Sequence, residues 1–266
     1  MKILIVGYGN MGKTYANSFI SSRFIKPEDI FVLVRNENFS TPESKIPKFN
    51  FSHIPTQKIR DFDIVILAVK PQDFGILAET IKPFLIDSQI IFSVMAGITL
   101  TTLNLKLSCS KIVRSMPNIP TQIGMGMTVF TASANVDRKE LFIIQNLINT
   151  TGKSVYVENE KLIDAATAIS GSGPAYVFYF MQSMIKAAVD LGFNESEAEL
   201  LVNQTFMGSV AIQNSYSLSN EEWIKKVASK GGTTESALKV FEKGILNQII
   251  VGGIKAANDR AMELGT

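Results

Sequence analysis

Apolar runs alternate with helix-compatible stretches through the first 158 residues of the chain. Runs rich in Ile and Val predict strands over residues 2–7, 30–35, 63–69, 89–95, 111–116 and 126–132. The stretches between them predict helices over residues 11–22, 71–84, 101–107 and 138–150, and residues 39–55, with three prolines, predict a loop. Strands that are apolar at nearly every position indicate a parallel sheet with helices on both faces.

The pattern changes after residue 158, where no further strand is predicted. Apolar positions at helical spacing predict helices over residues 161–169, 175–191, 195–215, 220–228, 235–243 and 245–264. We therefore predict an α/β domain over residues 1–158, with a doubly wound, mostly parallel sheet. An all-α domain is predicted over residues 159–266.

The predicted C-terminal helices are unusually apolar. Residues 165–169, 177–189 and 249–257 offer little polar face. A helix that is apolar nearly all round requires burial on every side, which a second subunit can supply. We therefore expect an oligomer that associates through the helical domain.

Composition narrows the function classes. The chain is 46% hydrophobic and 19% charged, and its net charge of +2 leaves no electrostatic footprint for nucleic acid or an anionic membrane. The longest apolar helix, over residues 175–189, is interrupted by Gln182 and Lys186, which favours a buried helix over a membrane span. The first nine residues are too short and glycine-rich for a signal peptide. We expect a soluble, cytoplasmic protein.

The sequence has few residues that could supply a thiol or an imidazole. One cysteine, Cys109, and one histidine, His53, are present. This count excludes an internal disulfide and a multi-cysteine metal site, and it disfavours a histidine-based metal site or triad. We expect chemistry that uses neither group, and no metal.

The motif GYGNMG directly follows the first predicted strand and opens a helix. Gly7 permits a tight turn, Gly9 lets backbone amides approach a pyrophosphate, and Gly12 lets helix and strand pack closely. The amides of Asn10 and Met11 then lie at the helix N-terminus, where anions are favoured. This context favours dinucleotide binding over a purely structural glycine turn.

The residues after the second strand bear on cofactor choice. A site for NAD usually has Asp or Glu there to hold the ribose hydroxyls, whereas this chain has Arg35 and Asn36. Arginine can pair with a 2′-phosphate, so we predict a preference for NADPH, with NADH possible. The alternative is that Arg35 is a solvated surface residue.

Two further strand ends are candidates for the cofactor site, because such sheets bind ligands at the carboxyl ends of their strands. Taken alone, each is better interpreted as an ordinary strand-to-helix turn. The candidate residues are Ala68, Val69, Lys70 and Pro71 after one strand, and Ala96 and Gly97 after the next.

A series of motifs in the second half of the chain carries a resemblance to a known family. The motifs are RSMPNIP at 114–120, GMGMT at 124–128, DAATAISGSGPAY at 164–176, QT at 204–205 and KGGTT at 230–234. In this order they resemble pyrroline-5-carboxylate reductase, of the 6-phosphogluconate-dehydrogenase-like Rossmann superfamily. The resemblance extends over essentially the whole chain.

The resemblance implies an activity and an assembly. Members of the family transfer hydride from NAD(P)H to the C=N carbon of 1-pyrroline-5-carboxylate and form L-proline, in the last step of proline biosynthesis. They interlock as dimers through their helical domains, and higher assemblies are built from these dimers. Met116, Pro117 and Asn118 are then expected beside the nicotinamide.

The resemblance also implies a substrate site around the GGTT motif. We expect backbone amides at this helix start to hold the substrate carboxylate, and the Thr234 hydroxyl to contact the ring nitrogen as the catalytic side chain. A hydroxyl is a poor general acid near pH 7, so the imine is expected to bind protonated or to take its proton through water. The remaining expected substrate-binding residues are Ser172, Gly173, Ser229, Gly231, Gly232 and Thr233.

Three alternatives remain open at this stage. One is a related NADP-dependent reductase acting on another cyclic imine carboxylate, and another is a non-catalytic nucleotide-binding paralogue. The third and more remote one is a reductase of a deazaflavin, which the SGSGP and GGTT motifs disfavour because they suit a compact substrate. One residue departs from the family pattern, since Lys230 stands where many members have proline. Its charge could help capture an anion, or the side chain could point to solvent.

Overall fold

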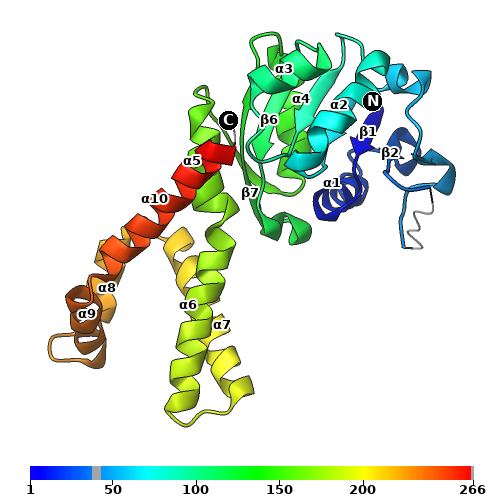
Figure 1. The fold of residues 1–266 in the computed structure, drawn as a ribbon. Helices are drawn as coiled ribbons and strands as arrows, with labels where there is room; N and C mark the ends of the chain where they lie inside the picture. The colour runs from blue at the N-terminus through cyan, green and yellow to red at the C-terminus, as the bar shows by residue number, and fades with distance from the viewer. Residues whose placement is uncertain (38–42, 265–266) are drawn as a thin grey trace. The chain divides into compact units, whose positions relative to one another are not determined.

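The computed structural model describes residues 1–37 and 43–264 (Figure 1). Eight strands form one sheet in the order β3-β2-β1-β4-β5-β6-β7-β8. All strand pairs are parallel except β6 with β7. The strands are β1 (Ile3–Val6), β2 (Ile30–Leu33), β3 (Phe51–Ser52), β4 (Ile64–Leu67), β5 (Ile90–Ser93), β6 (Ile112–Met116), β7 (Gly126–Ala132) and β8 (Gly152–Tyr156).

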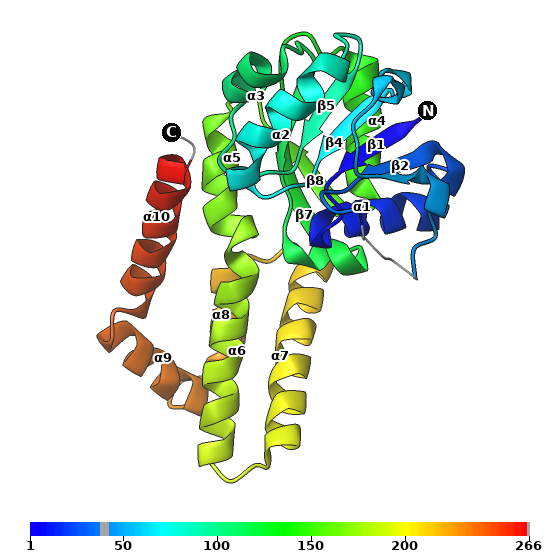
Figure 2. The ribbon, with the colours of Figure 1, turned by 45° about the vertical axis from the view of Figure 1, so that its right-hand side comes forward.

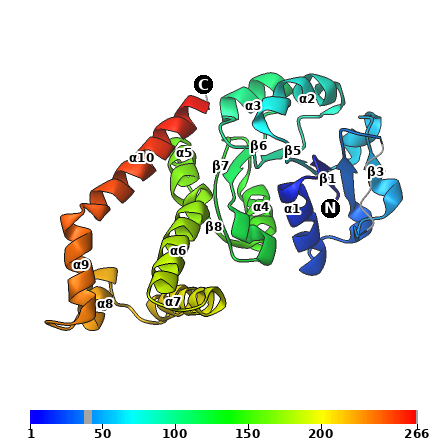
Figure 3. The same cartoon turned by 60° about the horizontal axis from the view of Figure 1, so that its bottom comes forward.

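Helices cover both faces of this sheet (Figure 3). Because successive side chains of a strand point to opposite faces, Ile3 and Ile5 face one layer while Leu4 and Val6 face the other. The first layer contains α1 (Asn10–Ser21) and α4 (Arg138–Asn149), and the second contains α2 (Phe74–Ile81) and α3 (Leu100–Leu107). The predicted doubly wound, mostly parallel sheet is confirmed.

Two strands, β3 and β8, were not predicted from the sequence. They are the two edges of the sheet, where a strand needs few apolar residues. β8 carries Lys153 and Ser154, and its Val155 and Tyr156 remain 46% and 40% exposed. β3 has only two residues and falls within the predicted loop 39–55, of which residues 39–42 lie outside the described chain.

The described chain after residue 158 is helical, as predicted. α7 has the predicted bounds, and the other helices begin or end within a few residues of them. The helices are α5 (Lys161–Ala166), α6 (Gly173–Asp190), α7 (Glu195–Ser215), α8 (Asn220–Val227), α9 (Thr233–Lys243) and α10 (Leu246–Leu264). Figure 2 shows α6 and α7 side by side, joined by a tight connection.

The described chain forms two compact units. One is Met1–Ser172 together with the end of α10 from Ala257 onward, and the other is Gly173–Ala256. The change from strands to helices near residue 158 therefore precedes the division between the units. α5 and the turn after it belong with the sheet.

The helices of the second unit leave large apolar side chains uncovered. On α6, Phe178 and Tyr179 are 62% and 70% exposed, and on α7 Leu200 and Met207 are each 68% exposed. Within the described residues, no helix has both the length and the hydropathy needed to cross a membrane. An uncovered apolar surface of this kind marks a site of association.

A buried arginine ties α5 to the sheet. Arg114, on β6, is 1% exposed, and its two terminal nitrogens donate to Glu160 at 2.9 Å and to Asp164 at 2.6 Å. The same oxygen of Glu160 accepts the amide of Leu100, the first residue of α3, at 2.8 Å. A buried charge is tolerated only when it is paired, so this cluster holds α3, α5 and β6 in one arrangement.

Replacing this arginine should destabilise the fold strongly. We expect Arg114→Met to lower the free energy of unfolding by about 3–5 kcal/mol, because two carboxylates lose their cation. Urea denaturation of the purified protein measures this. The matched control is Arg260→Met, since Arg260 pairs with Glu263 at 2.7 Å on an exposed helix surface and should cost below about 1 kcal/mol. Equal losses in the two variants would contradict the anchoring role.

Candidate functional site

The first glycine of GYGNMG is required by its backbone and by its neighbours. Gly7 has φ +92°, a region that favours glycine. A Cβ placed there would lie 2.7 Å from the carbonyl oxygen of Ala68 and 2.8 Å from Cγ1 of Val69. The loop after β1 therefore lies directly against the segment that follows β4.

The other two glycines differ from each other in their surroundings. A Cβ at Gly12 would lie 2.1 Å from the carbonyl oxygen of Gly7, so the start of α1 packs on the loop. A Cβ at Gly9 would meet nothing within 4 Å. Packing therefore explains Gly7 and Gly12, whereas Gly9 borders open space at the helix start, as a phosphate-binding loop requires.

The N-terminus of α1 is suited to an anion. Its N-cap is Gly9, which offers no side chain as a cap, and its first turn carries no acidic residue. The first amides of a helix have no intrahelical acceptor, and the helix dipole favours negative charge there. A pyrophosphate would satisfy these amides, including those of Asn10 and Met11.

The other cofactor candidates, after β4 and β5, lie at the same carboxyl end of the sheet as the glycine loop, because those strands run parallel to β1. Ala68 and Val69 are half-buried, while Lys70 and Pro71 are exposed. After β5, Ala96 is half-buried, and Gly97 is buried with φ +75°. These segments and the glycine loop therefore lie at the carboxyl end of the sheet.

Arg35 and Asn36 follow β2 and are exposed. Arg35 is engaged, however, since its Nη2 lies 2.6 Å from Oδ1 of Asp73, just before α2. Nothing in the sequence pattern pointed to this partner. Arg35, which is predicted to bind the 2′-phosphate, therefore has a carboxylate beside its guanidinium.

The MPN segment contacts the turn that follows α5. Asn118 donates from Nδ2 to the carbonyl of Ser170 at 3.1 Å and accepts the amide of Met127 at 2.8 Å. A Cβ on Gly171 would lie 2.6 Å from Cε of Met116, so the end of the Met116 side chain lies directly against Gly171. Two motifs that are 52 residues apart in the chain are thus in direct contact.

The turn between α5 and α6 is a π-helix, Thr167–Gly171. Single turns of this kind are rare and occur frequently at functional sites. It ends where the amide of Ser172 donates to the carbonyl of Thr167 at 2.8 Å. Ser172 is the last residue of the first compact unit, and Gly173 begins the second.

The second glycine motif forms the start of α9, with Gly232 as its N-cap. Gly231 has φ +75°, and its amide donates to Oε2 of Glu235 at 2.6 Å. The other carboxylate oxygen of Glu235 pairs with Lys239 at 3.2 Å. One of the amides predicted to hold the substrate is therefore occupied by a carboxylate of the chain itself.

The amide of Gly232, which follows Gly231, also forms a hydrogen bond within the loop. The amide of Gly232 donates to the carbonyl of Ser229 at 3.0 Å, and a Cβ on Gly232 would lie 2.6 Å from the Ser229 hydroxyl. Thr234 is half-buried, whereas Thr233 and Lys230 are exposed. The amides of Thr233 and Thr234 are in the first turn, where a helix supplies no acceptor of its own.

The predicted site residues thus fall into two groups. The first unit brings the glycine loop, the strand-end segments, Met116, Pro117, Asn118 and Ser172 to neighbouring positions. The second unit contains Gly173 and the loop 229–234. The first group includes a helix start suited to an anion, and the second includes another helix start whose first-turn amides have no intrahelical acceptor.

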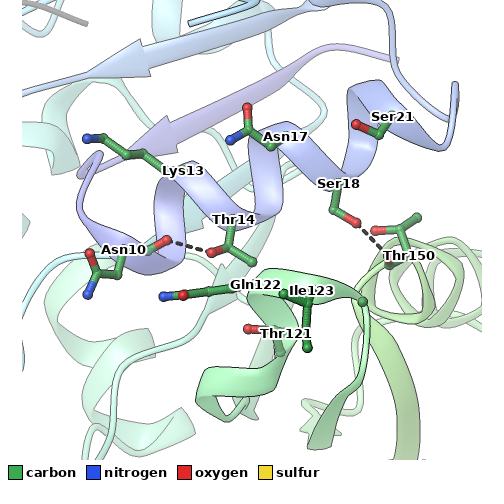
Figure 4. Close-up of a pocket in the computed structure, with 11 residues that line it drawn as sticks. Asn10, Lys13, Thr14, Asn17, Ser18, Ser21, Thr121, Gln122, Ile123 and Thr150 are labelled. Carbon is green, nitrogen blue, oxygen red and sulfur yellow. Dashed lines mark hydrogen bonds between the residues drawn. The ribbon is translucent and has the colours of Figure 1, made fainter. Parts of the chain in front are cut away.

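An open pocket of about 500 Å³ lies along α1 (Figure 4). Of the predicted site residues, only Asn10 lines it. Its walls are mainly amide and hydroxyl side chains that follow one side of α1 over its whole length. They are Asn10, Lys13, Thr14, Asn17, Ser18 and Ser21 of α1, with Thr121, Gln122, Ile123, Gly124 and Thr150 opposite.

Cys109 takes no part in these sites. It is 1% exposed, and burial raises the pKa of its thiol to about 11, which keeps it protonated and unreactive near neutral pH. Among the described residues, no three His, Cys, Asp or Glu side chains are grouped so that they could hold a metal ion.

Comparison with known proteins identifies the family. A family model described as pyrroline-5-carboxylate reductase dimerisation matches residues 160–264, and one described as NADP oxidoreductase, coenzyme F420-dependent, matches residues 2–97. Pyrroline-5-carboxylate reductase of Staphylococcus saprophyticus is 30% identical over 268 residues, covering 100% of this chain and 98% of that protein. The chain belongs to the pyrroline-5-carboxylate reductase family.

Other relatives agree. Pyrroline-5-carboxylate reductase 2 of Bacillus subtilis is 32% identical, covering 99% of this chain and 95% of that protein. The crystal structure of pyrroline carboxylate reductase from Plasmodium falciparum with NADP bound has a TM-score of 0.88 and 30% identity, covering 100% of this chain and 98% of that one. The resemblance carried by the motifs is confirmed, and with it the expectation of a Rossmann domain followed by the family's helical dimerisation domain.

The space at Gly9 gives a direct test of the nucleotide loop. We expect Gly9→Ala to raise the dissociation constant for NADPH at least about tenfold, because the methyl occupies the approach of a pyrophosphate. Since Gly9 has φ −78° and open surroundings, stability should change by less than about 1 kcal/mol. Gly75→Ala on α2, also in open surroundings, is the control that should leave binding intact. Unchanged NADPH affinity in Gly9→Ala would remove the loop from the site.

Proposed function

We propose that this protein reduces 1-pyrroline-5-carboxylate to L-proline with NADPH as the hydride donor, as the last step of proline biosynthesis. The observation that carries the proposal is the identity of 30–32% with enzymes of this name over essentially their whole length. The geometry of the two glycine motifs supports it, since one suits a nucleotide and the other a small carboxylate.

The residues of the first unit fit a dinucleotide. The amides at the start of α1 bind the pyrophosphate, and Gly9 leaves it room. The strand-end segments, Ala68–Pro71 and Ala96–Gly97, line the path of the cofactor, and Met116, Pro117 and Asn118 border the nicotinamide. Bound NADPH supplies the hydride, while the protein supplies binding and orientation. Arg35 reads the 2′-phosphate, with Asn36 beside it, which makes NADPH the preferred cofactor and NADH a weaker one.

The GGTT loop binds the substrate carboxylate through backbone amides. Gly232 bonds within the loop and Gly231 bonds to Glu235, so the amides of Thr233 and Thr234 carry most of this interaction. A substrate carboxylate at Gly231 has to displace Glu235 from that amide. Gly173 and Ser229, which lie in the same unit as this loop, are the other residues of that unit assigned to the substrate. Ser172, in the first unit, is assigned to the substrate as well.

Thr234 orients the substrate nitrogen. The residue is half-buried in the first turn of α9, and its hydroxyl is assigned one hydrogen bond with the ring nitrogen. A hydroxyl transfers protons poorly near pH 7, so the imine binds already protonated or takes its proton through water. The residue is thus a binding and orienting group in the reaction.

The active form is an interlocked dimer, possibly within a higher oligomer. The exposed apolar residues of α6 and α7 and the dimerisation model over residues 160–264 support self-association. The start of that match supports a functional domain boundary near residue 158. A net charge of +2 and a single buried cysteine support a cytoplasmic location without nucleic-acid or membrane partners.

The decisive experiment follows the oxidation of NADPH in the presence of pyrroline-5-carboxylate and then repeats it with NADH. We expect turnover with both cofactors and a higher kcat/KM with NADPH. Turnover with neither removes the proposed reaction and favours a non-catalytic nucleotide-binding protein. Turnover only with other cyclic imines would assign the related imine reductase activity, and a preference for NADH would remove the role of Arg35.

Removing the Thr234 hydroxyl should slow the reaction. We expect Thr234→Val to lower kcat/KM about 10- to 150-fold, because a hydrogen bond to a charged nitrogen contributes about 1.5–3 kcal/mol. The control is Thr80→Val, the same change at an exposed residue of α2 whose hydroxyl donates to the carbonyl of Ile76 in its own helix, and it should stay within about twofold. Steady-state kinetics with NADPH measures both variants. A change below twofold in Thr234→Val would mean that another group contacts the nitrogen.

A further inference from the structure

The ion pair between Arg35 and Asp73 spans the strand from which the nucleotide loop leaves. Arg35 follows β2, and Asp73 ends the short turn Pro71–Asp73 that follows β4. β2 and β4 pair with opposite sides of β1. An ion pair of 2.6 Å between the two segments therefore crosses the carboxyl end of β1, beside the glycine loop.

The carboxylate of Asp73 is not explained by helix capping. Asp73 is the N-cap residue of α2, yet its side chain makes no cap hydrogen bond, and its φ and ψ are those of a helical residue. Its side chain is 35% exposed and that of Arg35 is 72% exposed. Within the described part of the chain, the Asp73 carboxylate pairs with the guanidinium of Arg35.

We propose that Asp73 determines cofactor specificity by competing with the 2′-phosphate of NADPH for the guanidinium of Arg35. The inference rests on the proposed NADPH-binding function of the same site. A 2′-phosphate approaching Arg35 also approaches the carboxylate 2.6 Å from that guanidinium, and the two anions repel each other. NADH brings a neutral 2′-hydroxyl instead, so its binding is largely independent of the pair. Asp73 thus lowers the preference for NADPH that Arg35 creates.

Two other roles for the pair predict different results. If Asp73 orients Arg35 toward the phosphate, its removal weakens NADPH binding. If the pair is only a solvated surface contact, its removal changes neither cofactor, since exposed ion pairs contribute little. The direction and size of the change in NADPH affinity when the Asp73 carboxylate is removed therefore distinguish the three roles.

The test is Asp73→Asn, which keeps the shape of the side chain and removes its charge. Dissociation constants for NADPH and NADH come from nicotinamide fluorescence on the full-length protein. Displacement of the cofactor by 2′,5′-ADP measures the affinity for the half of NADPH that carries the 2′-phosphate, without the nicotinamide. We expect NADPH and 2′,5′-ADP to bind about two- to fivefold more tightly, the range for one exposed ion pair, with NADH unchanged. The gain should shrink at high salt.

Two further variants show where the effect arises. In an Arg35→Gln background, Asp73→Asn should give a smaller gain, because the group for which Asp73 competes is gone. Glu79→Gln removes another exposed carboxylate from the same helix and should leave the ratio of NADPH to NADH affinity unchanged. An equal gain in Glu79→Gln would mean that general charge, and not Asp73, sets the ratio.

Weaker or unchanged NADPH binding in Asp73→Asn overturns the inference. If the unmodified protein binds neither nucleotide, the inference and the proposed function fail together. If it binds nucleotide but does not turn over pyrroline-5-carboxylate, the proposed reaction fails while the affinities still decide the role of Asp73.

Discussion

The pairing of Arg114 with two carboxylates is the constraint on which the arrangement of the first unit depends. A guanidinium that is 1% exposed on a central strand demands partners, and Glu160 and Asp164 supply them from a helix 46 and 50 residues further along the chain. α5 is thereby fixed against the sheet. The π-helical turn that continues α5 then has a defined position, and Asn118 and Met116 can contact it. An electrostatic requirement in the core thus determines the placement of residues proposed to border the nicotinamide.

The nucleotide loop shows how one motif can divide structural and functional tasks among its glycines. Gly7 and Gly12 are required by close backbone contacts, and the loop would have to shift if either gained a side chain. Gly9 has no such contact. Tight packing at two positions fixes the backbone of the loop, while the third position borders open space at the start of α1. The rigidity matters because preorganised amides bind without first having to be ordered.

Much of this molecule could be predicted from the sequence because the relevant signals are local. Continuous apolar runs indicated the central strands, and GYGNMG and GGTT indicated two helix starts. The edge strands β3 and β8 escaped because edges need little hydrophobicity. Contacts between distant segments also escaped, since no local pattern reports that Arg114 meets Glu160 or that Asp73 meets Arg35. The bond from the amide of Gly231 to Glu235 spans only four residues and was not predicted either. The contacts of Asp73 and Glu235 bear most directly on the candidate sites.

The exposed apolar residues of α6 and α7 have a consequence for how the chain becomes stable. α6 has 18 residues, none of them buried in the single chain. In the proposed dimer, this helix takes its hydrophobic stabilisation from the second subunit, because it gains little from burial within its own. Folding of this region and association are then linked by mass action, so its stability rises with protein concentration. Dilution, and not only heat or denaturant, becomes a condition under which the helical region loses its structure.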